Sequence, residues 1–331
     1  MKIGILSLSK DYKKIGTSGG YPEFVFAKRE LSKLGEVIVL DKDNIKCLNS
    51  EDFHFFFLFS SQVNFFGGKL NQHVIDKWNF IAQSERPIFY WFWDTAIPLN
   101  NLCQTIHDRF GIDICSIQSD CLIVIHQFSK DIIDYWLHSA KNQHVLRHNF
   151  HYFDLTISYF IDVLQPSIPI SEIVYIGNYR SGRRTKQLIK YSQDIKINLY
   201  GNWNGKIDEM NVNWLGTVTE DRVKKTLNAY FGQLILADRE YIKYKQVSNG
   251  RLVLTVLSGT LPLIDEVFLS YHEIPDFARE LVISNCNDIK MILKMNKNKR
   301  YELICKYQDH FKMKFDNLDF SYFIKEIYDE L

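Results

Sequence analysis

The sequence predicts an α/β protein of two doubly wound domains, and three observations support this fold class. Short apolar runs alternate with amphipathic stretches of helical spacing along the chain, which is typical of parallel strands joined by crossover helices. The alternation starts again after Pro166 and Pro169, two prolines that disfavour a continuous helix and indicate a linker. The length of 331 residues suits two domains of ordinary size.

The predicted strands fall into two groups, one in each half of the chain. The first group covers residues 3–8, 37–40, 55–59, 88–93 and 122–125, and the second covers 173–176, 195–200, 212–215, 233–237 and 261–264. Helical spacing predicts helices over 22–34, 69–82, 183–192 and 220–231. The amphipathic segment that ends the chain is expected to pack back on the first domain. The predicted domains are therefore 1–165 together with 318–331, and 170–317.

The charge balance excludes a protein that binds nucleic acid over its whole surface. Lys and Arg number 40 against 39 Asp and Glu, a net charge of +1, so an anionic partner must meet a local basic patch. The most apolar run, 53–59, is far too short to cross a bilayer, and no signal-peptide pattern precedes the first strand. We therefore expect a soluble cytoplasmic protein without a membrane partner.

Neither the cysteines nor the histidines predict a metal site. The six cysteines are irregularly spaced and form no C-x-x-C pair, a pattern that indicates reduced thiols in the core. The spacing of His138, His144, His148 and His151 matches no common zinc finger. Packing or surface roles are sufficient for these histidines, and no metal ligand is predicted.

Ligands of doubly wound sheets bind beyond the carboxyl ends of the strands, so the turns after the strands are the candidate sites. A glycine-rich turn after the first strand leads to Glu23, which could face a ligand from the start of a helix. The helix dipole by itself also favours an acidic residue at this position. The turn after the third strand, 64–69, carries aromatic side chains and a lysine that can stack on a base and contact phosphate, or pack at a rim. The fourth strand ends at Asp94 beside two tryptophans. This position is consistent with a general base and equally with a carboxylate that caps the following turn.

The turn 176–186, "IGNYRSGRRTK", places four cations and two glycines between a predicted strand and a predicted helix. Gly177 and Gly182 permit a tight turn, while Arg180 and Arg184 offer paired donors that match phosphate oxygens. Cations at a helix N-terminus oppose the dipole unless an anion binds there. A second basic cluster includes Arg251 at the start of a helix-like run. The pattern therefore favours a phosphate-bearing ligand over a solvated basic face.

Several of these turns together resemble the DNA β-glucosyltransferases of T-even bacteriophages. The resemblance runs nearly from end to end, and its most specific segments are "SSQVNFFGGKLN" at 60–71, "GNYRSGRR" at 177–184 and "RLVLTVLSGTLPLIDE" at 251–266. It implies the GT-B fold, in which two doubly wound Rossmann-like domains face each other across a deep cleft. It also implies inverting transfer of glucose from UDP-glucose to 5-hydroxymethylcytosine in duplex DNA, with the target base flipped out.

The resemblance also implies roles for residues at matching positions. Asp94 would be the catalytic base, and Glu23 a carboxylate on the acceptor and sugar side. The donor diphosphate would be held by Gly177, Asn178, Arg180, Arg184 and Arg251, and the donor base and ribose region would include Val218 and Tyr241. The acceptor DNA would be contacted by Asn64, Phe65, Phe66, Gly67, Gly68 and Lys69. Mg²⁺ or Mn²⁺ assists enzymes of this family, although this chain shows no dedicated set of metal ligands.

Two departures from the family pattern bear on the substrates. Leu254 stands where the family has a glutamate that binds the ribose hydroxyls, so another group must hold the ribose or the donor differs. Ala96 stands where the family has an arginine. The alternatives are another UDP-sugar, a saccharide or already glucosylated acceptor, or a GT-B protein that binds DNA or a nucleotide without catalysis. The expected partners are a nucleotide-sugar and double-stranded DNA with a hydroxymethylated pyrimidine, bound by a monomer.

Overall fold

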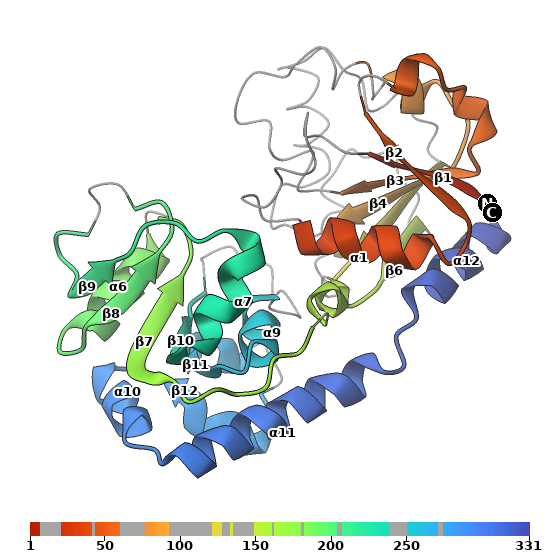
Figure 1. The fold of residues 1–331 in the computed structure, drawn as a ribbon. Helices are drawn as coiled ribbons and strands as arrows, with labels where there is room; N and C mark the ends of the chain where they lie inside the picture. The colour runs from red at the N-terminus through yellow and green to blue at the C-terminus, as the bar shows by residue number, and fades with distance from the viewer. Residues whose placement is uncertain are drawn as a thin grey trace. The chain divides into compact units, whose positions relative to one another are not determined.

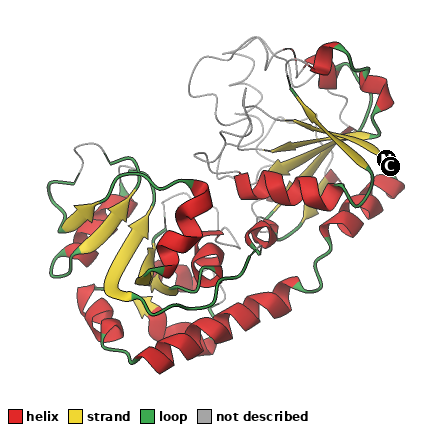
Figure 2. Cartoon of the chain, in the orientation of Figure 1, coloured by secondary structure: helices red, strands yellow, loops and turns green. Residues whose placement is uncertain are grey.

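The computed structural model describes most of the chain as two compact units. The described residues are 1–6, 21–41, 44–59, 76, 79–92, 121–127, 133–134, 149–160, 162–179, 182–203, 207–237, 250–270 and 274–331. Unit 1 comprises Met1–Ser158 with Asp319–Leu331, and unit 2 comprises Tyr159–Leu318. Each unit contains a six-stranded sheet with helices packed on it (Figures 1 and 2). The α/β class predicted from the alternating pattern is confirmed.

The sheet of unit 1 is parallel throughout, in the order β2-β1-β3-β4-β5-β6. Its strands are β1 (Lys2–Leu6), β2 (Glu36–Leu40), β3 (Phe55–Phe59), β4 (Ile88–Phe92), β5 (Leu122–His126) and β6 (Phe150–Tyr152). Helix α1 (Tyr21–Leu31) joins β1 to β2, and the segments η2 (Asn44–Lys46), η3 (Ser50–Asp52) and η7 (Leu155–Tyr159) are short 3₁₀ turns. Residues 55–58 of β3 are fully buried, because a central parallel strand is covered on both faces.

The last helix of the chain, α12 (Phe320–Glu330), completes the core of unit 1. The ring of Phe320 lies 5.5 Å from that of Phe26 in α1 and 5.3 Å from that of Trp91 in β4, measured between centroids. Asp319 begins the helix by accepting a hydrogen bond from the backbone N–H of Tyr322 at 3.1 Å, a typical N-cap. The contact between α1 and α12 can be followed in Figure 1.

The sheet of unit 2 is also parallel, in the order β12-β11-β10-β7-β8-β9. Its strands are β7 (Ile170–Ile176), β8 (Ile197–Tyr200), β9 (Val212–Trp214), β10 (Tyr230–Ile235), β11 (Leu261–Asp265) and β12 (Val282–Ile283). The helices are α6 (Arg183–Ser192), α7 (Glu220–Asn228), α9 (Gly250–Leu257), α10 (Cys286–Leu293) and α11 (Lys297–Phe315), with 3₁₀ segments η8 (Glu266–Ser270) and η9 (Asp276–Leu281).

The order of the strands in unit 2 creates a topological switch point between β7 and β10. The chain leaves β7 through α6 towards β8 and leaves β10 through α9 towards β11, which lies on the other side. Because such crossovers are right-handed, α6 and α9 lie on opposite faces of the sheet, and Figure 1 shows α7 and α9 together on one side. Ligands of doubly wound sheets bind where the direction of winding changes.

Arg300 of α11 fastens that helix to the edge of the sheet core. Its guanidinium donates to the carbonyl oxygens of Phe231 at 3.0 Å, Tyr230 at 3.2 Å, Ser167 at 3.2 Å and Gly259 at 3.3 Å. Only 2% of the residue is exposed. The buried charge is therefore distributed over four backbone acceptors, and no carboxylate among the described residues pairs with it.

Two sequence predictions in unit 2 need correction. The helix predicted over 220–231 ends at Asn228, and Tyr230 already begins β10. The strand predicted over 233–237 therefore starts three residues earlier than expected. Tyr230 and Phe231 are buried aromatics at the start of a central strand, and their apolar character fits either period until the sheet is in place. The short strands β6 and β12 and the helices α10 and α11 were not predicted.

The predicted helix 69–82 lies mostly outside the described residues; within it, residues 79–82 are helical. None of the helices in the described part of the chain combines the length and the apolar character needed to cross a membrane.

Candidate functional site

Arg251 lies at the switch point of unit 2 and bridges its two strands. One guanidinium nitrogen, Nη1, donates to the carbonyl oxygen of Leu236, just after β10, at 3.4 Å. The guanidinium carbon lies 5.3 Å from the ring centroid of Tyr175 in β7, a cation–π distance. These two contacts hold a planar, permanently charged group beside the carboxyl ends of β7 and β10.

The turn after β7 is held by a set of backbone contacts to the turn after β8. The N–H of Gly177 donates to the carbonyl oxygen of Tyr200 at 2.9 Å, and the indole N–H of Trp203 donates to the carbonyl oxygen of Gly177 at 2.6 Å. The side-chain oxygen of Asn178 accepts from the N–H of Asn202 at 2.9 Å. The backbone that follows β7 is therefore rigidly positioned, as a backbone binding site for a ligand requires.

Two glycines make this close approach possible. A Cβ at Gly177 would lie 2.8 Å from the hydroxyl of Tyr175, and a Cβ at Gly201 would lie 2.2 Å from the carbonyl oxygen of Gly177. Gly201 also has a φ of +132°, a conformation that other residues rarely adopt. The close contact between the two turns therefore depends on the missing side chain at Gly201, whereas a Cβ at Gly177 would meet the ring of Tyr175 in its own strand.

Helix α6 begins next to this turn with cations instead of acids. Its N-cap is Gly182, with a φ of +113°, and its first turn holds Arg183 and Arg184 and no acidic residue. Arg184 is 5% exposed, whereas the side chain of Arg183 is 39% exposed. The first-turn N–H groups and the guanidinium groups together favour an anion at this end of the helix.

An apolar wall lies on the α9 side of the switch point. Leu254 of α9, Val218 after β9 and Ile176 at the end of β7 pack, partly buried, against a cluster of Val174, Val223, Leu227 and Tyr230. The hydroxyls of Tyr200 and Tyr230 lie 3.2 Å apart in the same region, and burial, followed by this hydrogen bond, raises the pKa of Tyr230. Leu254 thus contributes apolar surface at the position where the family has a ribose-binding glutamate.

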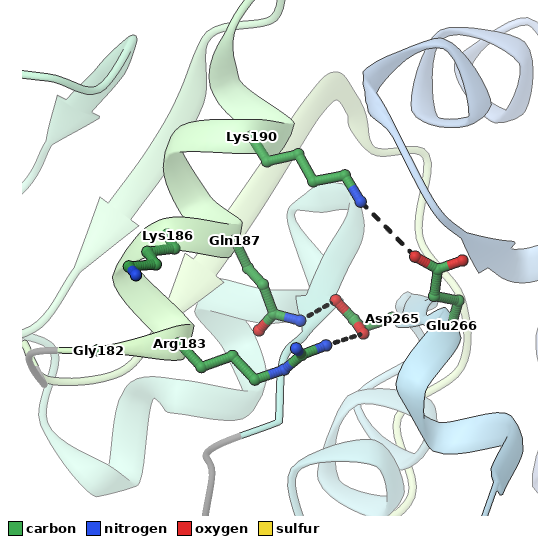
Figure 3. Close-up of a pocket in the computed structure, with 7 residues that line it drawn as sticks. All are labelled: Gly182, Arg183, Lys186, Gln187, Lys190, Asp265 and Glu266. Atoms are coloured by element: carbon green, nitrogen blue, oxygen red, sulfur yellow. Dashed lines mark hydrogen bonds and ion pairs between the residues drawn. The ribbon is translucent and has the colours of Figure 1, made fainter.

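A pocket of about 660 Å³ lies between the first two turns of α6 and the end of β11 (Figure 3). We call it the α6–β11 pocket, and its lining is Gly182, Arg183, Lys186, Gln187, Lys190, Asp265 and Glu266. Asp265, at the end of β11, accepts from the hydroxyl of Tyr191 at 2.8 Å, the N–H of Val267 at 3.0 Å and a guanidinium nitrogen of Arg183 at 3.5 Å, and also from the amide of Gln187. Burial and the carboxylate of Asp265 raise the pKa of Tyr191, so its hydroxyl remains a donor.

The described predicted residues of the second half all belong to unit 2 and follow its strands or begin its helices. Gly177, Asn178, Arg184, Arg251 and Val218 all lie around the carboxyl ends of the unit 2 strands or the starts of its helices. Glu23 is buried in the first turn of α1 in unit 1, with 3% of its surface exposed. The residues outside the described part are Asp94, Arg180, Tyr241 and the segment 64–69.

Sequence reasoning did not identify the network around Asp265. Asp265 and Glu266 end a segment that the resemblance includes, but the local sequence pattern indicates no role for them or for Gln187. The rule applied to Asp94, a carboxylate at the carboxyl end of a strand, would have found Asp265 as well. Among the described residues, no three His, Cys, Asp or Glu side chains are grouped to hold a metal ion.

Comparisons with known proteins agree with this architecture. Residues 173–331 match the family model described as the C-terminal domain of Glucosyltransferase 3-like proteins. The chain is 23% identical to the DNA beta-glucosyltransferase of Enterobacteria phage T4 over 342 residues, which cover 92% of each protein. The resemblance inferred from the sequence motifs is confirmed.

Solved structures extend the comparison to the fold. The T4 phage β-glucosyltransferase in complex with UDP and Mn²⁺ superposes with a TM-score of 0.71 at 18% identity, covering 96% of this chain and 100% of that one. An alpha-glucosyltransferase in complex with UDP-glucose and DNA containing an abasic site reaches a TM-score of 0.63 at 10% identity, with 99% and 98% covered. The chain therefore has the fold of these enzymes, and the GT-B prediction is confirmed.

Proposed function

We propose that the chain is a DNA glycosyltransferase that moves glucose from UDP-glucose to 5-hydroxymethylcytosine in duplex DNA, with inversion at the sugar. The observation that supports this proposal is the position of Arg251 at the topological switch point of unit 2, beside the end of β7, together with the basic first turn of α6, the helix that follows β7. The likeness to the T4 enzyme over 92% of the chain supports the choice of donor and acceptor. The protein acts as a monomer in the cytoplasm of a phage-infected bacterial cell.

The donor diphosphate is bound by unit 2. The backbone at Gly177 and Asn178 approaches it, the first-turn N–H groups of α6 point to it, and Arg180, Arg184 and Arg251 neutralise its charge. These groups stabilise the negative charge that develops on the leaving UDP as the glycosidic bond breaks. The donor base lies against the main chain of Val218, and Tyr241 belongs to the same region. Leu254 is part of the apolar wall beside the switch point. The ribose therefore contacts an apolar side chain at the position where the family has a glutamate that binds the ribose hydroxyls.

The acceptor is bound by unit 1. Asp94 takes the proton of the hydroxymethyl group as its oxygen attacks the anomeric carbon, and Glu23 acts on the acceptor and sugar side. The segment from Asn64 to Lys69 receives the target base, with Phe65 and Phe66 available for stacking and Lys69 for a phosphate. The base must leave the helix stack to react, at a cost of a few kcal/mol. Mg²⁺ or Mn²⁺ would assist the reaction at the diphosphate, and the described residues provide no cluster of His, Cys, Asp or Glu for such an ion.

The proposal is tested by incubating the protein with UDP-sugars and DNA. Hydroxymethylated and unmodified duplexes are each combined with UDP-glucose and with a panel of other UDP-sugars, and the digested nucleosides are weighed by mass spectrometry. The expected product is glucosylated hydroxymethylcytosine from UDP-glucose only, with the β configuration in the NMR spectrum. Absence of any sugar on hydroxymethylated DNA, with UDP bound normally, would refute the proposed reaction.

Asp94→Asn is the matched test of the base. It retains the size of the side chain but cannot accept the proton, so turnover should fall by at least about a hundredfold while UDP affinity stays within about twofold. Near-normal turnover of this variant would remove Asp94 from the mechanism. DNA binding should weaken steeply with salt, since only a local patch of cations contacts the phosphates.

Leu254 favours one alternative, a transferase with the same fold but a different substrate. Either its donor is another UDP-sugar, or its acceptor is a saccharide or DNA that is already glucosylated. The sugar panel and a glucosylated duplex, included in the same assay, detect both possibilities. A protein that binds DNA or nucleotide without catalysis would bind UDP but leave every nucleoside unmodified.

A further inference from the structure

Gln127 is a buried amide at the carboxyl edge of the unit 1 sheet. It follows His126, the last residue of β5, and 0% of its surface is exposed. Neither the nitrogen Nε2 nor the oxygen Oε1 of its side chain has a hydrogen-bond partner in the protein. A buried amide without partners costs free energy. An apolar side chain of the same size would therefore serve the packing of the core better than this glutamine does.

The register of the strands shows which face of the sheet carries this side chain. The N–H of Phe153 donates to the carbonyl oxygen of His126 at 2.9 Å. This bond continues the register of β5 and β6 by one step, so Gln127 lies opposite Phe153 and on the same face. The ring of Phe153 lies 5.2 Å from that of Phe320 in α12, and α12 contacts α1 (Figure 1). Gln127 therefore faces the layer formed by α1 and α12.

Glu23 brings a second buried polar side chain to the same edge and the same face. Helix α1 joins the parallel strands β1 and β2, so its first turn lies at the carboxyl ends of the strands. The ring of Phe26 in α1 lies 6.1 Å from that of Trp91 in β4, and Glu23, three residues earlier, is 3% exposed. Three residues of helix cover about 4.5 Å, so Glu23 lies at the level where β4 ends.

The strand next to Gln127 leads to the proposed catalytic base. Phe92, the last residue of β4, pairs with His126, and Asp94 follows Phe92 by two positions in the sequence. Neighbouring strands are about 4.8 Å apart, which is similar to the distance between the oxygen of a 5-hydroxymethyl group and the far nitrogen of its pyrimidine ring. A base that presents its hydroxymethyl group at the end of β4 can therefore bring its ring edge to the end of β5.

The two unpartnered atoms of Gln127 indicate which group they bind. A glutamine amide offers an NH₂ group that donates and an oxygen that accepts. The pairing edge of cytosine carries the complementary set side by side, namely the ring nitrogen N3, which accepts, and the exocyclic amino group, which donates. Enzymes that act on a flipped base read it through hydrogen bonds at this edge. The amide of Gln127 therefore matches the edge of a flipped cytosine.

We propose that Gln127 determines specificity for the acceptor by binding the pairing edge of the flipped base, with Nε2 donating to N3 and Oε1 accepting from the amino group. This inference deepens the proposed function and rests on it, because it takes the acceptor to be a flipped hydroxymethylcytosine bound by unit 1. Gln127 takes no proton in the reaction. It holds the ring so that the hydroxymethyl oxygen is presented to Asp94.

A binding cycle with two proteins and two duplexes tests this contact. One duplex contains a single hydroxymethylcytosine, and the other has an abasic site at the same position. Gln127→Met keeps the length of the side chain and removes both hydrogen-bonding atoms, so affinity for the hydroxymethylcytosine duplex in the presence of UDP should fall at least about tenfold. Affinity for the abasic duplex should stay within about twofold, because that duplex has no base edge to bind.

The stability of the same variant distinguishes a binding role from a structural one. Methionine brings no unpaired polar atom into the core, so Gln127→Met should raise the midpoint of urea unfolding by about 0.5 M. A lower midpoint would indicate a lost structural contact and contradict the inference. Thr260→Val is the matched control, because Thr260 is fully buried in unit 2 and its hydroxyl also has no partner. It should raise the midpoint but leave the affinity for both duplexes unchanged.

Other outcomes would overturn the proposal in defined ways. Equal losses of affinity on the two duplexes would mean that Gln127 shapes the protein without binding the base, and unchanged affinity for both would remove it from the acceptor site. Weaker binding of UDP-glucose, with UDP unaffected, would assign it to the donor sugar. If the wild-type protein transfers no sugar to hydroxymethylated DNA and binds the two duplexes equally, the proposed function fails and this inference fails with it.

Discussion

Replacement of Gly201 by alanine should disturb the candidate site through the backbone alone. The new Cβ would lie 2.2 Å from the carbonyl oxygen and 2.7 Å from the carbonyl carbon of Gly177, and both are backbone atoms that cannot rotate away. The φ of +132° adds strain of about 2 kcal/mol for a residue with a Cβ. Separating the two turns adds about 2 kcal/mol, as overpacking does in a core. We therefore expect Gly201→Ala to destabilise unit 2 by about 4 kcal/mol.

Gly182→Ala provides the control, because Gly182 has a similar φ of +113° but an added Cβ there would have no atom within 4 Å. It should cost only the strain, about 2 kcal/mol. Urea unfolding followed by tryptophan fluorescence measures both, since Trp203 and Trp214 hydrogen-bond to these two turns. The difference of about 2 kcal/mol corresponds to about 1 M in the unfolding midpoint for a slope near 2 kcal/mol/M.

UDP binding is the functional measurement for Gly201→Ala. A displaced Gly177 turn should lower UDP affinity by about tenfold compared with the wild-type protein, because the turn and the start of α6 that follows it would no longer be positioned for the phosphates. Equal stability of the two alanine variants, together with unchanged UDP affinity in Gly201→Ala, would refute the argument that contact between the two turns builds the site.

Three further changes have expected outcomes in other parts of the molecule. Arg251→Lys should lower UDP affinity about tenfold by calorimetry, since a lysine cannot stack on Tyr175 or offer paired donors; unchanged affinity would place the diphosphate elsewhere. Arg300→Met should destabilise unit 2 by at least about 4 kcal/mol in urea, because four carbonyl oxygens lose their donor. Asp319→Ala should cost about 1 kcal/mol at pH 7 as a lost N-cap. Hydrogen bonds from Ser321 and Tyr322 hold the pKa of Asp319 below 3.8, so its contribution is complete above that pH and is lost as the pH falls through the lower, folded value. Unfolding measured as the pH is lowered from 6 should show the difference between the two proteins narrow below pH 3.8, and a difference that does not narrow would contradict this origin.

Local sequence patterns were sufficient for the elements whose character does not depend on the rest of the chain. Apolar runs such as Phe55–Phe59 predict strands buried on both faces. The glycines and arginines after Ile176 favour a phosphate-type turn in the same local way, and this role stays a prediction. The start of β10 was not predictable in the same way. Tyr230 and Phe231 continue the apolar spacing of α7, and only their pairing with β7 and β11 makes them part of a strand.

The sequence by itself determined the α/β class and predicted two wound units and a set of residues for binding a diphosphate, because periodicity, glycine and charge act over a few neighbouring positions. Only the tertiary structure decided which of these residues meet. Arg251 reaches the ring of Tyr175 across the switch point, and Gln187 is oriented by Asp265, 78 positions further along the chain. Such contacts depend on strand order and on the direction of each crossover. Those are properties of the folded sheet, and no local stretch of residues contains them.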